Sequence, residues 1–125
     1  MPSPSKPPTR RSKRAAARPF FRFYHSDALR DKTVAVLSAI EKAEDGTKHR
    51  PALADIVVEL TSAGMNYFYL EPLRLAKAGF LVEQSAGLGI SASNSMMAPV
   101  IRTIINRMDH AQLVAVCKYI RLLMK

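Results

Sequence analysis

The sequence predicts an all-α protein: a compact bundle of four to five helices around a central kinked helix, with a disordered basic N-terminal arm. Apolar residues recur at intervals of three and four over most of residues 28–125, which is the period of an amphipathic helix. Short polar connections separate these stretches, as they do between antiparallel neighbours in a bundle. The first 19 residues contain no Val, Ile, Leu or aromatic residue, so they offer nothing to a core.

The chain therefore divides into a disordered basic arm, residues 1–19, and a single helical domain, residues 20–125. Five of the eight prolines lie in the arm. A segment with so little apolar surface cannot offset the entropy lost on ordering, so we expect it to be disordered. The whole chain is 48% hydrophobic, and the residues after the arm are numerous enough to form one packed core.

Positive charge is concentrated at the N-terminus. Residues 1–22 carry +7 of the net +9 and no acidic residue, whereas the remainder is close to neutral. Such a block is typical of an arm that binds nucleic acid or another polyanion through counterion release, with weak sequence preference. A solubilising tail is the alternative. The predicted nucleic-acid-binding residues are Lys6, Arg10, Arg11, Lys13, Arg14, Arg18 and Arg22.

Aromatic residues follow the arm, in the run Phe20-Phe21-Arg22-Phe23-Tyr24-His25. Rings interleaved with basic residues can stack on unpaired bases or lie at a membrane surface. Rings just before a helix can instead pack onto the core and fix the entry of the chain. We expect packing, because four exposed rings would form a patch that monomers rarely tolerate.

The first two helices have clear signals. One is expected over residues 28–44, capped by Ser26 or Asp27, with Gly46 in the left-handed conformation after its end. The second begins near Pro51, which suits a first helical turn because it needs no amide hydrogen, and ends at Gly64.

The stretch 63–80 is predicted to be the central element. Its apolar residues surround most of a helical circumference, which indicates burial on several sides. Pro72 removes a backbone hydrogen bond, so we expect either one kinked helix from Tyr67 to Glu83 or a short turn followed by a helix from Pro72.

The C-terminal third is expected to contain a loop and two more helices. Residues 85–93 are small and glycine-bearing, which is typical of a loop. A helix over residues 95–109 would have Pro99 within about its first turn. Asp109 and Gln112 have capping-box spacing, and the last helix carries an apolar stripe that includes Leu113 and Cys117.

Residues 53–60, 63–65 and 73–83 together resemble a winged helix-turn-helix pattern. The resemblance covers about forty residues. It implies a DNA-binding regulator in which residues 80–84 and 88–92 are the strands of a β-hairpin wing. The segment that would be the recognition helix holds aromatic residues at positions 67–69, where polar and basic groups should read base edges. We therefore prefer a bundle helix.

No motif indicates catalysis, so we expect a non-enzymatic, cytoplasmic protein with no cofactor. His25, His49 and His110 are isolated from one another and from other metal ligands at helical spacing. Cys117, the single cysteine, lies on an apolar stripe where it acts as a small apolar residue. The glycines at 87 and 89 do not match a phosphate-loop fingerprint.

A second class of function remains open, that of a helical protein–protein interaction or dimerisation module with an incidental tail. The last two predicted helices would supply its apolar faces to a homo-oligomer or a protein partner. Both faces are rich in methionine: Met96, Met97, Met108 and Met124. A ligand cavity lined by Tyr67, Tyr69 and Phe80 is a third possibility.

Overall fold

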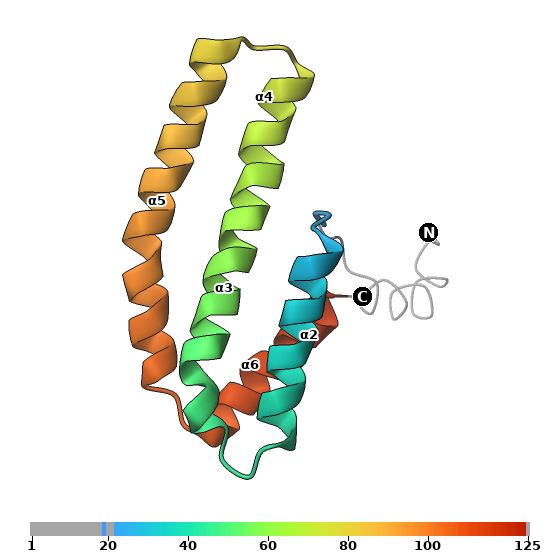
Figure 1. Ribbon diagram of the computed structural model, residues 1–125, viewed down its shortest axis with the longest axis vertical. Coiled ribbons are helices and arrows are strands. Elements are labelled where there is room, and N and C mark those ends of the chain that lie inside the picture. The colour runs from blue at the N-terminus through green and yellow to red at the C-terminus, as the bar shows by residue number, and fades with distance from the viewer. Residues whose placement is uncertain (1–18, 20–21, 125) are drawn as a thin grey trace, which may run out of the picture.

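The computed structural model describes residue 19 and residues 22–124 (Figure 1). Helices account for most of this range, and no strand occurs in it, so the all-α prediction is confirmed. The predicted disordered arm lies outside the described residues, apart from Pro19. In chain order the elements are α2 (Asp27–Lys42), the 3₁₀ turn η1 (Gly46–His49), α3 (Arg50–Met65), the π-helix η2 (Asn66–Leu70), α4 (Glu71–Leu75), α5 (Phe80–Asn106) and α6 (His110–Leu123).

A long helical hairpin dominates the molecule. The elements α3, η2 and α4 follow one another without a break, and α5 runs back beside them (Figure 1). The turn at the tip is a Schellman motif, in which the Ala78 amide donates to the Leu73 carbonyl at 3.0 Å and Lys77 is left-handed with φ of 54°. The tip of the hairpin projects beyond α2 and α6, which lie beside only the half that is far from the tip (Figure 1).

The helix passes through the two positions at which the sequence predicted an interruption. Gly64 does not end α3, and the helix continues to Leu75 rather than beginning at Tyr67 and reaching Glu83. Within η2 the hydrogen bonds span five residues, as in the bond from the Glu71 amide to the Asn66 carbonyl. Pro72, which has no amide hydrogen, follows at once. The wider π-turn therefore accommodates the proline without breaking the helix.

The predicted loop over residues 85–93 is wrong, because α5 is continuous for 27 residues. Pro99 lies in the interior of this helix rather than in a first turn. Residues 80–84 and 88–92, the wing strands implied by the winged-helix resemblance, are helical as well. Packing along α3 overrides the low helix propensity of the serines and glycines, which is only a weak preference.

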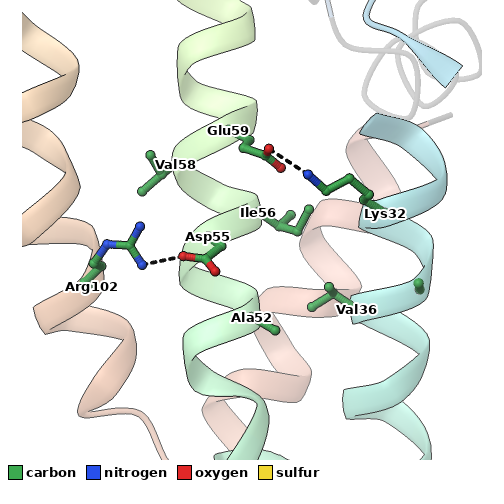
Figure 2. Close-up of a pocket in the computed structure, with 9 residues that line it drawn as sticks. Lys32, Val36, Ala52, Asp55, Ile56, Val58, Glu59 and Arg102 are labelled. Carbon is green, nitrogen blue, oxygen red and sulfur yellow. Dashed lines mark hydrogen bonds and ion pairs between the residues drawn. The ribbon is translucent and has the colours of Figure 1, made fainter. Parts of the chain in front are cut away.

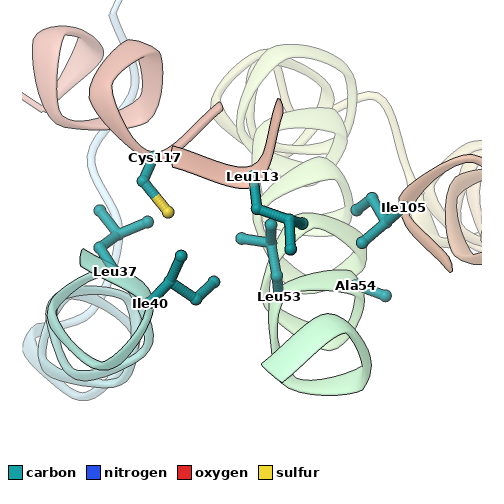
Figure 3. Packing of buried hydrophobic residues seen from close by; sticks show 7 residues of the cluster. All are labelled: Leu37, Ile40, Leu53, Ala54, Ile105, Leu113 and Cys117. Carbon is teal, nitrogen blue, oxygen red and sulfur yellow. The ribbon is translucent and has the colours of Figure 1, made fainter. Parts of the chain in front are cut away.

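The hydrophobic core lies at one end of the bundle, where all four long helices meet (Figure 3). The apolar stripes of α2 and α6 both face this core, so the patterns expected for the first and last helices are confirmed. The stretch 67–80 is not the buried centre that the sequence predicted: no residue of η2 or α4 is buried. The core cluster consists of Leu37, Ile40, Leu53, Ala54, Ile105, Leu113 and Cys117.

The helix starts agree with local capping chemistry. The Ser26 hydroxyl accepts from the Leu29 amide at 3.1 Å, and Pro51 occupies the first turn of α3. The capping box of α6 is complete, since Asp109 and Gln112 exchange hydrogen bonds of 2.8 and 2.9 Å. These predictions are confirmed, because each depends on residues within one turn of the chain.

Gly46 is buried, but not in the conformation predicted for it. Lys77 and Gly79 are the residues with positive φ in the described part of the chain. Gly46 instead permits a close approach, because a Cβ there would lie 3.0 Å from Ile40 Cγ2 and 3.2 Å from His110 Nδ1. The glycine is required by packing between the end of α2 and the start of α6 rather than by its own backbone.

An ion pair joins α2 to α6 beside the core. Arg121 Nε donates to both carboxylate oxygens of Glu41, at 3.0 and 2.9 Å, and Arg121 Nη2 donates to Ser38 Oγ at 2.9 Å. The hydrogen bond from Arg121 holds the pKa of Glu41 below its usual range, against a smaller opposing effect of desolvation.

Candidate interaction surfaces

An open groove of about 580 Å³ runs over α3 between α2 and α5 (Figure 2). Val36, Ala52 and Ile56 form much of its apolar floor. Two ion pairs cross it, one from Lys32 Nζ to Glu59 Oε1 at 2.7 Å and one from Arg102 to Asp55. Each carboxylate faces a cation from a neighbouring helix, so the pairs join helices and present no free acid–base couple.

A second hollow of about 420 Å³ continues this groove and shares Lys32 and Glu59 with it. Its other lining residues are three polar ones, Ser26, Ser62 and Asn66, and three apolar ones, Ala28, Leu29 and Ala63. Tyr67, Tyr69 and Phe80 line neither of these two hollows, so the third possibility raised by the sequence gains no support.

The cysteine and one of the histidines, residue types often used in catalysis or metal binding, have structural roles here. Within residue 19 and residues 22–124, no group of three or more His, Cys, Asp or Glu side chains is positioned to hold a metal ion. Cys117 is buried in the core, and burial, aided by the charge of Glu41, raises the pKa of its thiol to about 11. The Nδ1 atom of His110 accepts from the Gly46 amide at 2.8 Å.

Of the predicted nucleic-acid-binding residues, Lys6, Arg10, Arg11, Lys13, Arg14 and Arg18 lie outside the described residues. Arg22 is described and is exposed on the segment that leads into α2.

A cluster of aromatic rings lies where this segment meets the hairpin. The Phe23 ring lies over Gly64, with centroids 6.2 Å from Tyr67 and 6.0 Å from Phe68. The prediction that aromatic residues before the first helix pack back onto the domain is therefore confirmed for Phe23. Its partners belong to η2, so the π-helix gathers rings beside the segment that leads into α2.

Tyr24 belongs to this ring cluster but remains 73% exposed. Its ring packs on Tyr67 at a centroid distance of 6.2 Å with an interplanar angle of 62°. Phe23 packs on the rings of η2, whereas the Tyr24 ring contacts Tyr67 and remains accessible to a ligand. No sequence pattern distinguishes the packed ring of Phe23 from the exposed ring of Tyr24, because that difference depends on the register of η2.

Another exposed surface is the side of α5 that points away from α3, here called the outer face of α5. Large apolar residues are exposed on it, with Leu81 and Met96 each at 77% and Leu88 at 67%. The outer face of α5 consists of Leu81, Ser85, Leu88, Ala92, Met96, Pro99 and Thr103, all of them exposed.

The methionines expected to form apolar interaction surfaces divide into two pairs. Met96 and Met97 on α5 are exposed. Met108 and Met124 are partly buried against the core, so they contribute to folding. Sequence reasoning found the outer face of α5 only in part, because it assigned residues 85–93 to a loop.

No helix in the described part of the chain is both long and apolar enough to cross a membrane. No protein-family model matches this chain, and no curated protein or solved structure is significantly similar to it. Its function has to be argued from these surfaces.

Proposed function

We propose that this is a non-enzymatic nucleic-acid-binding protein whose basic arm contacts phosphates and whose ring cluster at the base of the arm stacks on unpaired bases. The observation that carries the proposal is the position of Tyr24: an accessible ring fixed on the domain two residues after Arg22. Arm electrostatics alone would suit any polyanion, whereas an accessible aromatic ring favours single strands.

The charge distribution supports the arm as the source of affinity. Outside residues 1–22, twelve Lys and Arg residues accompany ten Asp and Glu residues, so the domain carries little net charge. Several of its cations are engaged with carboxylates, namely Lys32, Arg74, Arg102 and Arg121. The arm has no acidic residue to compete with phosphate.

The first test measures binding of single- and double-stranded DNA and RNA oligonucleotides at two salt concentrations, with the full chain and with residues 1–19 deleted. The deletion removes six cations, which accounts for a salt slope of up to about 4 on a single strand. We expect affinity to fall steeply with salt in the full chain and to be largely lost in the deletion. Unchanged affinity after deletion would overturn the proposal.

The second test separates stacking from charge. Tyr24→Ala should weaken single-strand binding by roughly fivefold or more, because stacking contributes about 1–3 kcal/mol per base, and should leave heparin binding unchanged. Tyr119→Ala is the matched control, since Tyr119 is 62% exposed but lies on α6. Equal effects of Tyr24→Ala on single strands, duplexes and heparin would reject the stacking role.

A further inference from the structure

Among the described residues, the outer face of α5 has no partner, and it carries no charge. Only two of the 27 residues of α5 are charged, Glu83 and Arg102, and neither belongs to the outer face. Glu83 lies 3.9 Å from Arg74 at the hairpin, and Arg102 pairs with Asp55 on α3. An uncharged and mainly apolar stripe along a whole helix, interrupted by Ser85 and Thr103 alone, is unusual for a surface that faces water only.

The stripe is narrow and continuous. At 100° per residue, its seven members fall within about 80° of one another around the helix. It is bordered on one side by Gln84, Ser91 and Arg102, all of them exposed. The two buried side chains of α5, Ile90 and Ile105, lie on the opposite side.

The stripe is also symmetric about Ala92. Its members are spaced 4, 3, 4, 4, 3 and 4 residues apart, a series that reads the same in both directions. Leu88 and Met96 lie four residues on either side of Ala92, and Leu81 and Thr103 lie eleven residues on either side. Two copies of such a stripe can therefore meet in register about a two-fold axis when one helix direction is reversed.

We infer that the partner of this face is a second copy of the chain, with the two α5 helices antiparallel and the two-fold axis at Ala92. In that arrangement Leu88 of one copy packs on Met96 of the other, and Leu81 packs near Thr103. The smallest side chain of the stripe lies at the axis, where the helices approach most closely.

Gly89, beside Ala92 on the edge of this face, supports close approach. It is exposed in the middle of α5, and a Cβ built on it would meet nothing within 4 Å. A glycine in a helix interior costs about 0.5–1 kcal/mol relative to alanine, and no contact with the described part of the chain requires one here. A neighbouring helix backbone packed against this position would.

The area fits a weak dimer. A helix of this length extends about 40 Å, and pairing along one side of it removes on the order of 1,000 Å² from water in total, the lower limit for a specific interface. We expect dissociation constants in the micromolar range. A membrane surface fits less well, because interfacial helices carry several Lys and Arg residues beside the apolar stripe, whereas α5 has one, Arg102, and it pairs with Asp55.

This inference is independent of nucleic-acid binding, because none of its residues belongs to the arm or the ring cluster. Sedimentation of the full chain across micromolar concentrations should show a monomer–dimer equilibrium. Leu88→Glu and Met96→Glu should each raise the dissociation constant at least about tenfold, since each buries two carboxylates, one from each copy, against an apolar side chain of the other copy. Gln84→Glu and Ser91→Glu, on the same helix beside the stripe, should leave it nearly unchanged.

Cysteine cross-linking tests the arrangement. Ala92→Cys should form a disulfide-linked dimer on oxidation by copper phenanthroline, because the two positions meet at the axis. Leu81→Cys alone should not, since its two copies would lie about 33 Å apart, but it should cross-link to Thr103→Cys in a mixture. Cys117 can stay in place because it is buried.

Three results would overturn the inference. One is a wild-type chain that stays monomeric at all concentrations, including one that binds lipid vesicles through Leu88 instead. The second is a dimer that Leu88→Glu and Met96→Glu leave intact, which would place the interface elsewhere. The third is efficient cross-linking of Leu81→Cys to itself, which would indicate parallel helices. The cysteine variants keep the test decisive if a glutamate variant fails to fold.

Discussion

The Nδ1 atom of His110 accepts a hydrogen bond of 2.8 Å from the amide of Gly46, which joins the α2–α3 connection to the first residue of α6. A second bond runs nearby, from Arg50 Nε to the carbonyl of Met108, also at 2.8 Å. Together they fasten both connections at the core end of the bundle. Four helix termini are thus held in one place, although they lie far apart in the sequence.

Gly46→Ala should therefore destabilise the protein. The new Cβ would meet Ile40 Cγ2 at 3.0 Å and the His110 ring at 3.2 Å, so the loss should be about 1–3 kcal/mol in urea unfolding. Gly87→Ala is the control, because a Cβ there meets nothing within 4 Å inside a helix, and it should stabilise by about 0.5–1 kcal/mol. Equal effects of the two changes would contradict the packing argument.

Leu113→Ala should cost about 2–5 kcal/mol, because Leu113 is completely buried in the core between α2, α3 and α6 (Figure 3). Leu122 lies on the same helix but is 59% exposed, so Leu122→Ala should change the free energy of unfolding by no more than about 0.5 kcal/mol. Urea denaturation followed by circular dichroism distinguishes the two. A small effect at Leu113 would show that the core is elsewhere.

Lys77→Gly should stabilise the protein by about 0.5–1 kcal/mol. Lys77 holds the left-handed position of the Schellman motif at the hairpin tip, with φ of 54°, where a side chain is unfavourable and glycine is not. Lys77→Ala removes the same charge and keeps the Cβ, so thermal unfolding should show no comparable gain. A stabilisation by both changes would assign the effect to charge.

The ion pair of Glu41 and Arg121 should make stability depend on pH at the acidic end. Hydrogen bonding to Arg121 lowers the pKa of Glu41 in the folded chain below its unfolded value. The stabilisation is therefore present above the unfolded pKa, near 4.5, and is lost as the pH falls through the folded pKa. Solvent screening keeps it small, since both side chains are partly exposed.

A double-mutant cycle measures this pair. The destabilisation by Glu41→Gln should be largest near neutral pH, shrink as the pH falls below the unfolded pKa of Glu41, and be mostly lost in an Arg121→Gln background, where Lys118 is the remaining cation that lowers this pKa. A pH dependence that persists without Arg121 would assign the lowered pKa to another group.

The core end of the fold could be predicted from the sequence, and the long hairpin could not. Capping at Ser26 and Asp109 depends on neighbouring residues, and the apolar stripes of α2 and α6 follow one helical period. Both features could therefore be predicted from the sequence. The breaks expected at Gly64 and Pro72 follow from propensities that η2 overcomes with one wide turn. Whether a helix survives such residues depends on what packs beside it.

The candidate surfaces show the same division. The charge of the arm is a property of composition, and it points to polyanions without any fold. The exposure of Tyr24 depends on how η2 orients Tyr67, which no sequence pattern reports. The outer face of α5 becomes visible only when residues 85–93 are known to be helical, and its spacing between Leu81 and Thr103 was the available signal.

Because the core occupies one end of the bundle, the two ends of the hairpin should open independently. Amide hydrogens near Leu53 and Leu113 should exchange only on global unfolding, whereas those of α4 and of the first turns of α5 should exchange through local fraying. Pairing along α5 would then slow exchange at the far end as protein concentration rises, because a partner that binds only the closed hairpin stabilises it. Dimer formation and closing of the far end of the hairpin would then be coupled, and amide exchange would measure this coupling at each residue.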